Sequence, residues 1–230
     1  MDKGRMMSPG AAGGEFTTRQ SLAVATALEV ALLFGALLAF IWRWQFTYPH
    51  AWMALWALIL ASHVLHRDTL RSLGVSWTEL GASARVVLPV AVILYLPLLV
   101  YGFARHSLVL LRPGWQCLIP LLGYGSWCVF QQYLTQSYFH NRLMLIIRNH
   151  HVSSVLVGVM FGAAHIPNAV LMIATSIAGF VFAEVFARHR NIWALGLAQA
   201  VGGLLIAAVC PDAVLHHMRV GPGYFFYQIR

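Results

Sequence analysis

VVLPVAVILYLPLLVYGF, residues 86–103, contains no charged side chain. An 18-residue helix rises about 27 Å, close to the roughly 30 Å of a bilayer's hydrocarbon core. Similar apolar runs recur along the chain, which is 60% hydrophobic and only 10% charged, with a mean hydropathy of +0.71. Soluble domains carry about 25% charged residues, so a soluble core of this length could not hide so much apolar surface. The sequence therefore predicts a multi-pass α-helical integral membrane protein.

Apolar length divides the chain into seven expected spans, and hence into an all-α, polytopic helix bundle. We expect residues 1–20 to form a disordered polar tail, residues 21–210 to form the transmembrane domain, and residues 211–230 to form a C-terminal tail. The expected spans are about 21–41, 48–65, 86–103, 115–133, 152–165, 169–187 and 192–209.

The basic residues predict the orientation of these spans. The N-terminal tail and every second connection hold ten of the 15 Lys and Arg residues: Lys3, Arg5, Arg19, Arg67, Arg71, Arg85, Arg142, Arg148, Arg188 and Arg190. The positive-inside rule then places the N-terminus in the cytoplasm, and we expect a bacterial inner-membrane protein. The net charge of +8 is interpreted as orientation and contact with anionic lipid headgroups, because no basic cluster interleaved with aromatic residues indicates nucleic acid.

The cysteines and histidines do not predict a metal or cofactor. Cys117, Cys128 and Cys210 lie within apolar runs, and the sequence contains no CxxC motif. We therefore interpret them as small buried hydrophobic residues. His63 and His66 are the one histidine pair near helical ligand spacing, and the many clustered ligands of a histidine-box oxygenase are lacking. We therefore expect no cofactor and no metal site.

Polar residues at membrane depth are costly and mark candidate functional sites. Four places qualify, and each has a purely structural alternative. The segment with Gln131, Gln132 and Gln136 could be an amphipathic extension of a helix, and His165, which follows Phe161, could form an interhelical hydrogen bond. Glu184 could pair with Arg188 at i,i+4. Gln199, which precedes Gly203, could bridge two helices. Glu29 is a further oddity without a partner that the sequence identifies.

In this order, these segments resemble the CAAX-protease and bacteriocin-processing (CPBP, or ABI) family of intramembrane proteases. The resemblance covers roughly residues 70–205, including the Phe161-x-x-x-His165 motif in FGAAHIPN and the segment LRSLGVSW at 70–77. The family's other motifs are a Glu-Glu-x-x-x-Arg and a histidine followed four residues later by asparagine. Here those positions hold Gln131, Gln132, Gln136, Gln199 and Gly203.

This departure implies a change of function. In the family mechanism glutamate activates water, whereas an amide has no lone pair basic enough to take a proton near neutral pH. General acid–base assistance is worth about 10²–10⁴-fold, so losing the carboxylates, the arginine and a histidine should abolish hydrolysis of the family type. The motif-equivalent catalytic positions are His165, Gln131, Gln132 and Gln199, and the expected cavity-lining residues are Gln136, Phe161, Glu184 and Gly203.

Three functions remain open from the sequence. The first is a non-proteolytic member that binds, scaffolds or assembles a membrane protein or an isoprenoid-like or lipid-like ligand. The second is an active intramembrane peptidase with rearranged catalytic groups, using His165 and Glu184. The third is another membrane-embedded enzyme, either metal-dependent or acting on a lipid-like substrate.

Overall fold

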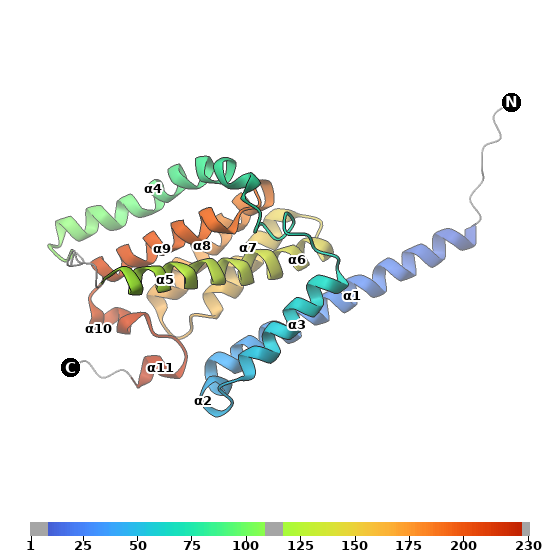
Figure 1. Cartoon of the computed structure of the whole chain (residues 1–230), viewed down its shortest axis with the longest axis horizontal. Coiled ribbons are helices and arrows are strands. Elements are labelled where there is room, and N and C mark those ends of the chain that lie inside the picture. Colours follow the sequence, from blue (N-terminus) through green and yellow to red (C-terminus); the bar gives the residue numbers. More distant parts are fainter. Residues whose placement is uncertain (1–8, 109–116, 227–230) are drawn as a thin grey trace.

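The computed structural model describes residues 9–108 and 117–226, and within these ranges it is helical with no strand (Figure 1). This confirms the predicted all-α fold. The long helices are α1 (Pro9–Ala39), α3 (Ala51–Leu65), α4 (Leu80–Ala104), α5 (Leu118–Gln132), α7 (His150–Ala163), α8 (Ala169–Arg188) and α9 (Ile192–Val209). The shorter ones are α2 (Gln45–Thr47), α6 (Asn141–Ile146), α10 (Asp212–Leu215) and α11 (Pro222–Phe225). Two π-helices (Phe40–Trp44, Tyr133–His140) and two 3₁₀ turns (Trp77–Glu79, His216–Met218) complete the described chain.

Four helices are long and apolar enough to cross a membrane: Gln20–Thr47, Trp77–Ala104, Ala169–Arg188 and Ile192–Val209. The second and fifth expected spans correspond to helices of only 15 and 14 residues, below the usual range of about 17–25. The fourth corresponds to α5, and its expected start near residue 115 lies outside the described residues. The count of seven spans therefore stays a prediction.

The helix that carries the glutamine-rich segment does not stop at Gln132. It continues as the π-helix Tyr133–His140 and then as α6, since no glycine or proline interrupts residues 126–146. The sequence predicted this continuation but not the π-helical turns. Such turns are rare and often occur at functional sites.

Small residues bring α7 and α8 into close contact. A Cβ atom added at Gly158 would lie 2.6 Å from the carbonyl oxygen of Ser176, and one at Gly179 would lie 3.0 Å from the Cα of Gly158. A Cβ at Gly162 would overlap the hydroxyl of Ser176. This is the small-xxx-small packing of membrane helices.

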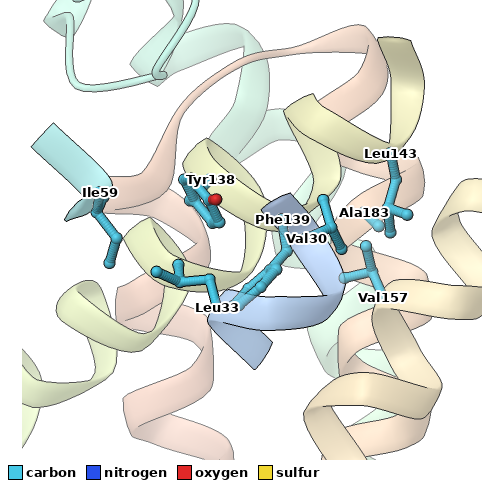
Figure 2. Close-up of a cluster of buried hydrophobic side chains, with 8 residues drawn as sticks. All are labelled: Val30, Leu33, Ile59, Tyr138, Phe139, Leu143, Val157 and Ala183. Carbon is cyan, nitrogen blue, oxygen red and sulfur yellow. The ribbon is translucent and has the colours of Figure 1, made fainter. Parts of the chain in front are cut away.

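A hydrophobic cluster joins the α1–α3 hairpin to the rest of the bundle (Figure 2). Val30 and Leu33 of α1 and Ile59 of α3 are all buried. They pack in one cluster with residues of the π-helix and of α6, α7 and α8: Tyr138, Phe139, Leu143, Val157 and Ala183. The α1–α3 hairpin therefore packs against the continuous helix formed by α5, the π-helix Tyr133–His140 and α6, which carries the glutamines.

The two predicted tails contain helical structure. Helix α1 begins at Pro9, inside the region expected to be a disordered tail, while residues 1–8 lie outside the described residues. At the other end, α10 and α11 fold back on the bundle. The amide of Asn168 donates to the carbonyl of Leu215 at 2.8 Å, and the backbone N–H of Gly221 donates to the carbonyl of Ile166 at 2.8 Å.

Candidate functional site

Three glutamine side chains form a head-to-tail chain of amides between α5 and α9. Gln132 Nε2 donates to Gln199 Oε1 at 2.6 Å, and Gln199 Nε2 donates to Gln131 Oε1 at 2.5 Å. Gln132 is fully buried and the other two are half-buried. Gln199 is therefore fixed by one hydrogen bond accepted and one donated. Three of the motif-equivalent positions, Gln131, Gln132 and Gln199, are thus in direct contact with one another.

His165 lies just beyond the end of α7. Its Nδ1 is 2.7 Å from the carbonyl oxygen of Phe161 and 3.3 Å from the hydroxyl of Thr175. A carbonyl accepts only, so Nδ1 carries the proton and Nε2 remains a hydrogen-bond acceptor. Phe161 also packs edge-on against the imidazole, with 5.1 Å between ring centroids. The intact Phe-x-x-x-His motif thus fixes both the tautomer and the orientation of the histidine.

Two cavities, of about 550 and 520 Å³, meet at this site. The first lies between the α1–α3 hairpin and helices α5 and α7, and its wall includes Trp52, Trp56 and Phe130. The second lies among α4, α5, α8 and α9, and its wall includes Tyr95, Tyr124 and Gln199. Both cavities are bounded by the same five residues: Trp127, Gln131, Phe161, His165 and Val220.

The described walls of both cavities contain no Asp, Glu, Lys or Arg side chain. They consist of aliphatic and aromatic groups with a few amides, hydroxyls, one imidazole and one thiol. A ligand with a long apolar portion and a small neutral polar group matches such a wall.

Glycine at position 203 leaves room for a tyrosine. A Cβ there would overlap the hydroxyl of Tyr124 and lie 3.0 Å from its Cζ. Gly203 and Tyr124 both line the second cavity. The space beside residue 203 of α9 is thus filled by a side chain of α5.

Three residues expected at the site, Gln132, Gln136 and Glu184, do not line either cavity. Gln136 is fully buried behind the wall with Gln132, and neither residue lines a cavity. Among the described atoms, both polar side-chain atoms of Gln136 lack a hydrogen-bond partner, as does Gln132 Oε1. Gln132 reaches the site only through its bond to Gln199.

Glu184 lies at the opposite end of α7 from His165. Its carboxylate is 3.0 Å from His151 Nδ1 and 3.1 Å from Arg188 Nη1, so the i,i+4 pair with Arg188 is confirmed. Because α7 has 14 residues, its two ends lie roughly 20 Å apart. Glu184 therefore does not line the cavities, and it cannot act as a base beside His165 in this arrangement.

Sequence reasoning missed a buried ionic cluster near the same end of the bundle. Arg142 is 1% exposed, with Nη2 2.6 Å from Asp68 Oδ2 and Nε 3.4 Å from Glu29 Oε1. Tyr138 donates to Glu29 at 2.7 Å, and His66 lies 3.0 Å from its other oxygen. The signals were present as Glu29 and the His63–His66 pair, but their partners come from distant parts of the chain.

Taken together, these helices form a polytopic membrane bundle with a neutral polar site at the junction of two apolar cavities. Residues 113–205 match the family described as type II CAAX prenyl endopeptidase Rce1-like. The match confirms the resemblance to CAAX proteases and includes Gln131, Gln132, Gln136, His165 and Gln199. The segment 70–77, also assigned to the resemblance, lies outside it. The comparisons with curated proteins and with solved structures gave no match.

Proposed function

We propose that this CAAX-protease-like membrane protein does not cleave peptides and instead binds a hydrophobic ligand or a membrane partner in its paired cavities. The observation that carries the proposal is the amide chain through Gln199, which stands where the family has ionisable catalytic groups. A carboxylate base would need to lie within about 3 Å of an attacking water, and the described cavity walls supply none.

The remaining titratable groups do not replace that base. His165 has one acceptor nitrogen, but among the residues that the structure describes no carboxylate contacts it to stabilise its protonated form. Burial raises the pKa of the Cys210 thiol, so the thiol stays protonated near neutral pH and is a weak nucleophile. These features favour binding over either family-type hydrolysis or thiol chemistry.

The ligand class follows from the walls. The isoprenoid or acyl chain of a ligand would occupy the aromatic first cavity. A carbonyl or amide group at the end of that chain would exchange hydrogen bonds with Gln131 and Gln199. A partner's transmembrane helix with a polar group at mid-depth presents the same chemistry. Amides suit such neutral groups because each offers both donors and acceptors.

We also propose that the N-terminus faces the cytoplasm of a bacterial inner membrane. The turns after α3, α6 and α8 lie at one end of the bundle (Figure 1). These turns and the adjoining helix ends carry Arg67, Arg71, Arg85, Arg142, Arg148, Arg188 and Arg190. Single cysteines introduced at residue 71 or residue 148 would then be protected from a membrane-impermeant thiol reagent in intact spheroplasts. Labelling of both positions in intact spheroplasts would instead show that this end of the bundle faces the periplasm.

The function is tested with purified full-length protein in detergent or nanodiscs. We expect no cleavage of a farnesylated CAAX peptide, together with saturable binding of S-farnesylcysteine methyl ester. Binding is followed by the fluorescence of Trp52, Trp56 and Trp127, which line the first cavity. Peptide cleavage that disappears in His165→Ala would overturn the proposal in favour of an active peptidase.

A pair of variants distinguishes ligand binding at the polar site from nonspecific partition of the ligand into detergent. Gln199→Leu removes the central amide and should weaken ligand binding about tenfold, since one or two hydrogen bonds are lost. Leu197→Gln changes the opposite, exposed side of α9 and should leave binding unchanged. Equal binding by both variants would show that the polar site plays no part.

A further inference from the structure

Two adjacent histidines at the start of α7 face the carboxylate of α8. His151 Nδ1 lies 3.0 Å from Glu184 Oε1, and His150 Nε2 lies 3.7 Å from Glu184 Oε2. The two imidazole rings are 3.9 Å apart at their centroids. One ligand atom from each of these residues lies within 4.8 Å of the other two. Within the described part of the chain, this is the one group of three or more His, Cys, Asp or Glu side chains with that geometry.

We propose that His150, His151 and Glu184 bind a first-row transition-metal dication of the Zn²⁺ type. Zinc binds imidazole nitrogen and carboxylate oxygen at about 2.0–2.2 Å, so ligand atoms on a tetrahedral ion are roughly 3.3 Å apart. The distance from His151 Nδ1 to Glu184 Oε1, 3.0 Å, and that from His150 Nε2 to Glu184 Oε2, 3.7 Å, fall on either side of that value. Imidazole selects Zn²⁺, Cu²⁺ or Ni²⁺ over Mg²⁺ and Ca²⁺, which prefer oxygen ligands. A water molecule completes a set of three protein ligands.

The site is open to an ion from solution. The side chains of His150 and His151 are 45% and 58% exposed, while Glu184 is 15% exposed and held in place. The backbone N–H of His151 donates to Asn149 Oδ1 at 2.9 Å, which caps α7 and fixes the start of the helix. Two adjustable imidazoles and one fixed carboxylate can close around the metal without moving the backbone.

Arg188 competes for the same carboxylate. Its Nη1 lies 3.1 Å from Glu184 Oε2, and its side chain is 55% exposed. An exposed ion pair is worth at most about 1 kcal/mol, so a dication with two imidazole ligands displaces the guanidinium. Arg188 thus lowers metal affinity without abolishing the site.

The metal would join the first turn of α7 to the last turn of α8. These helices already pack through Gly158, Gly162 and Gly179, and their far ends carry His165 and Thr175 of the cavity site. The metal itself stands roughly 20 Å from His165, at the other end of α7. Its role is to fasten the helix pair, which is independent of whether the cavities bind or cleave anything.

The test uses full-length protein in detergent with the affinity tag removed. Zinc content after gel filtration and titration calorimetry with ZnCl₂ should both give one ion per chain. His151→Ala and Glu184→Gln should each weaken zinc binding by at least about tenfold, the loss that ligand-shell changes commonly cause. Arg188→Ala should strengthen it. Bound zinc should also raise the unfolding temperature of the wild type but not of Glu184→Gln.

A matched control is the double variant His216→Ala/His217→Ala, which removes another adjacent histidine pair beside an acidic residue. This variant should bind zinc as the wild type does. Zinc binding that persists in both His151→Ala and Glu184→Gln would overturn the proposal. So would the failure of folded wild-type protein, as judged by its gel-filtration profile, to bind zinc at one ion per chain.

Discussion

The hydroxyl of Tyr124 occupies the space that a side chain at residue 203 would need. This relationship links α5 to α9 beside Gln199 at the wall of the second cavity, so a larger side chain at residue 203 would change the packing there. Any side chain at residue 203 would require the tyrosine to move.

Gly203→Asn should destabilise the protein by about 1–3 kcal/mol, the usual cost of overpacking a well-filled interior. The measurement is thermal unfolding in detergent. Adding Tyr124→Phe should recover part of the loss, because the overlapping hydroxyl is removed while Cζ stays close. Gly125→Ala is the control, since nothing lies within 4 Å of a Cβ at that position. A Gly203→Asn variant as stable as Gly125→Ala would contradict the packing described above.

Gln199→Leu should destabilise the bundle by about 1–3 kcal/mol, because it leaves the buried Nε2 of Gln132 without its acceptor. The double variant Gln132→Leu/Gln199→Leu should lose less than the sum of the two single changes, since neither partner then remains unsatisfied. A double-mutant cycle measured by chemical unfolding gives this coupling directly. Strict additivity would mean that the two amides do not interact.

Arg142→Met should cost up to about 3–5 kcal/mol, because the partly buried carboxylates of Glu29 and Asp68 would lose the fully buried cation that they face. Arg71→Met is the matched control: Arg71 is 76% exposed and its pair with Glu79 is 3.4 Å long. An exposed pair contributes at most about 1 kcal/mol, so the control should unfold close to the wild type. Equal effects of the two changes would argue against a buried cluster.

The lowered pKa of the Asp68 carboxyl predicts that the folded protein loses stability in acid. Burial, the largest influence, would raise the pKa of this carboxyl, but hydrogen bonds from Arg142 and His63 and their positive charges outweigh it and lower the pKa. The unfolded carboxyl titrates near its ordinary value of 3.8. The contribution of Asp68 is therefore complete above that pH and declines as pH falls through the lower folded-state pKa. Unfolding temperatures measured between pH 3 and 6 should show this decline in the wild type.

In Asp68→Asn the acid-dependent part of that profile should shrink, because the amide does not titrate. The variant should also be less stable near pH 6, where the wild type retains the ion pair with Arg142. Parallel profiles for the two proteins would assign the acid sensitivity to other carboxyls.

Local patterns were sufficient for most of the helices. The boundaries expected for the last two spans fall within two residues of α8 and α9, since an apolar run between Asn168 and Arg188 or after Asn191 leaves few alternatives. The shared placement of Gln131, His165, Gln199 and Gly203 was found by comparing motifs, which carry spatial information that periodicity lacks. The π-helix was not foreseen, because its sequence differs little from that of an ordinary amphipathic helix.

By itself the sequence determined that the chain is a helical membrane protein, because the cost of placing backbone and apolar groups in the wrong solvent depends on composition and run length alone. It also determined that residues 131, 132 and 199 are neutral amides, since residue identity fixes which protons a side chain can accept. The partners of Glu29 and Glu184, the burial of Arg142 and the filling of the space at Gly203 by Tyr124 were decided only by the tertiary structure. Those contacts join residues far apart in the chain, and the packing of whole helices sets their distances.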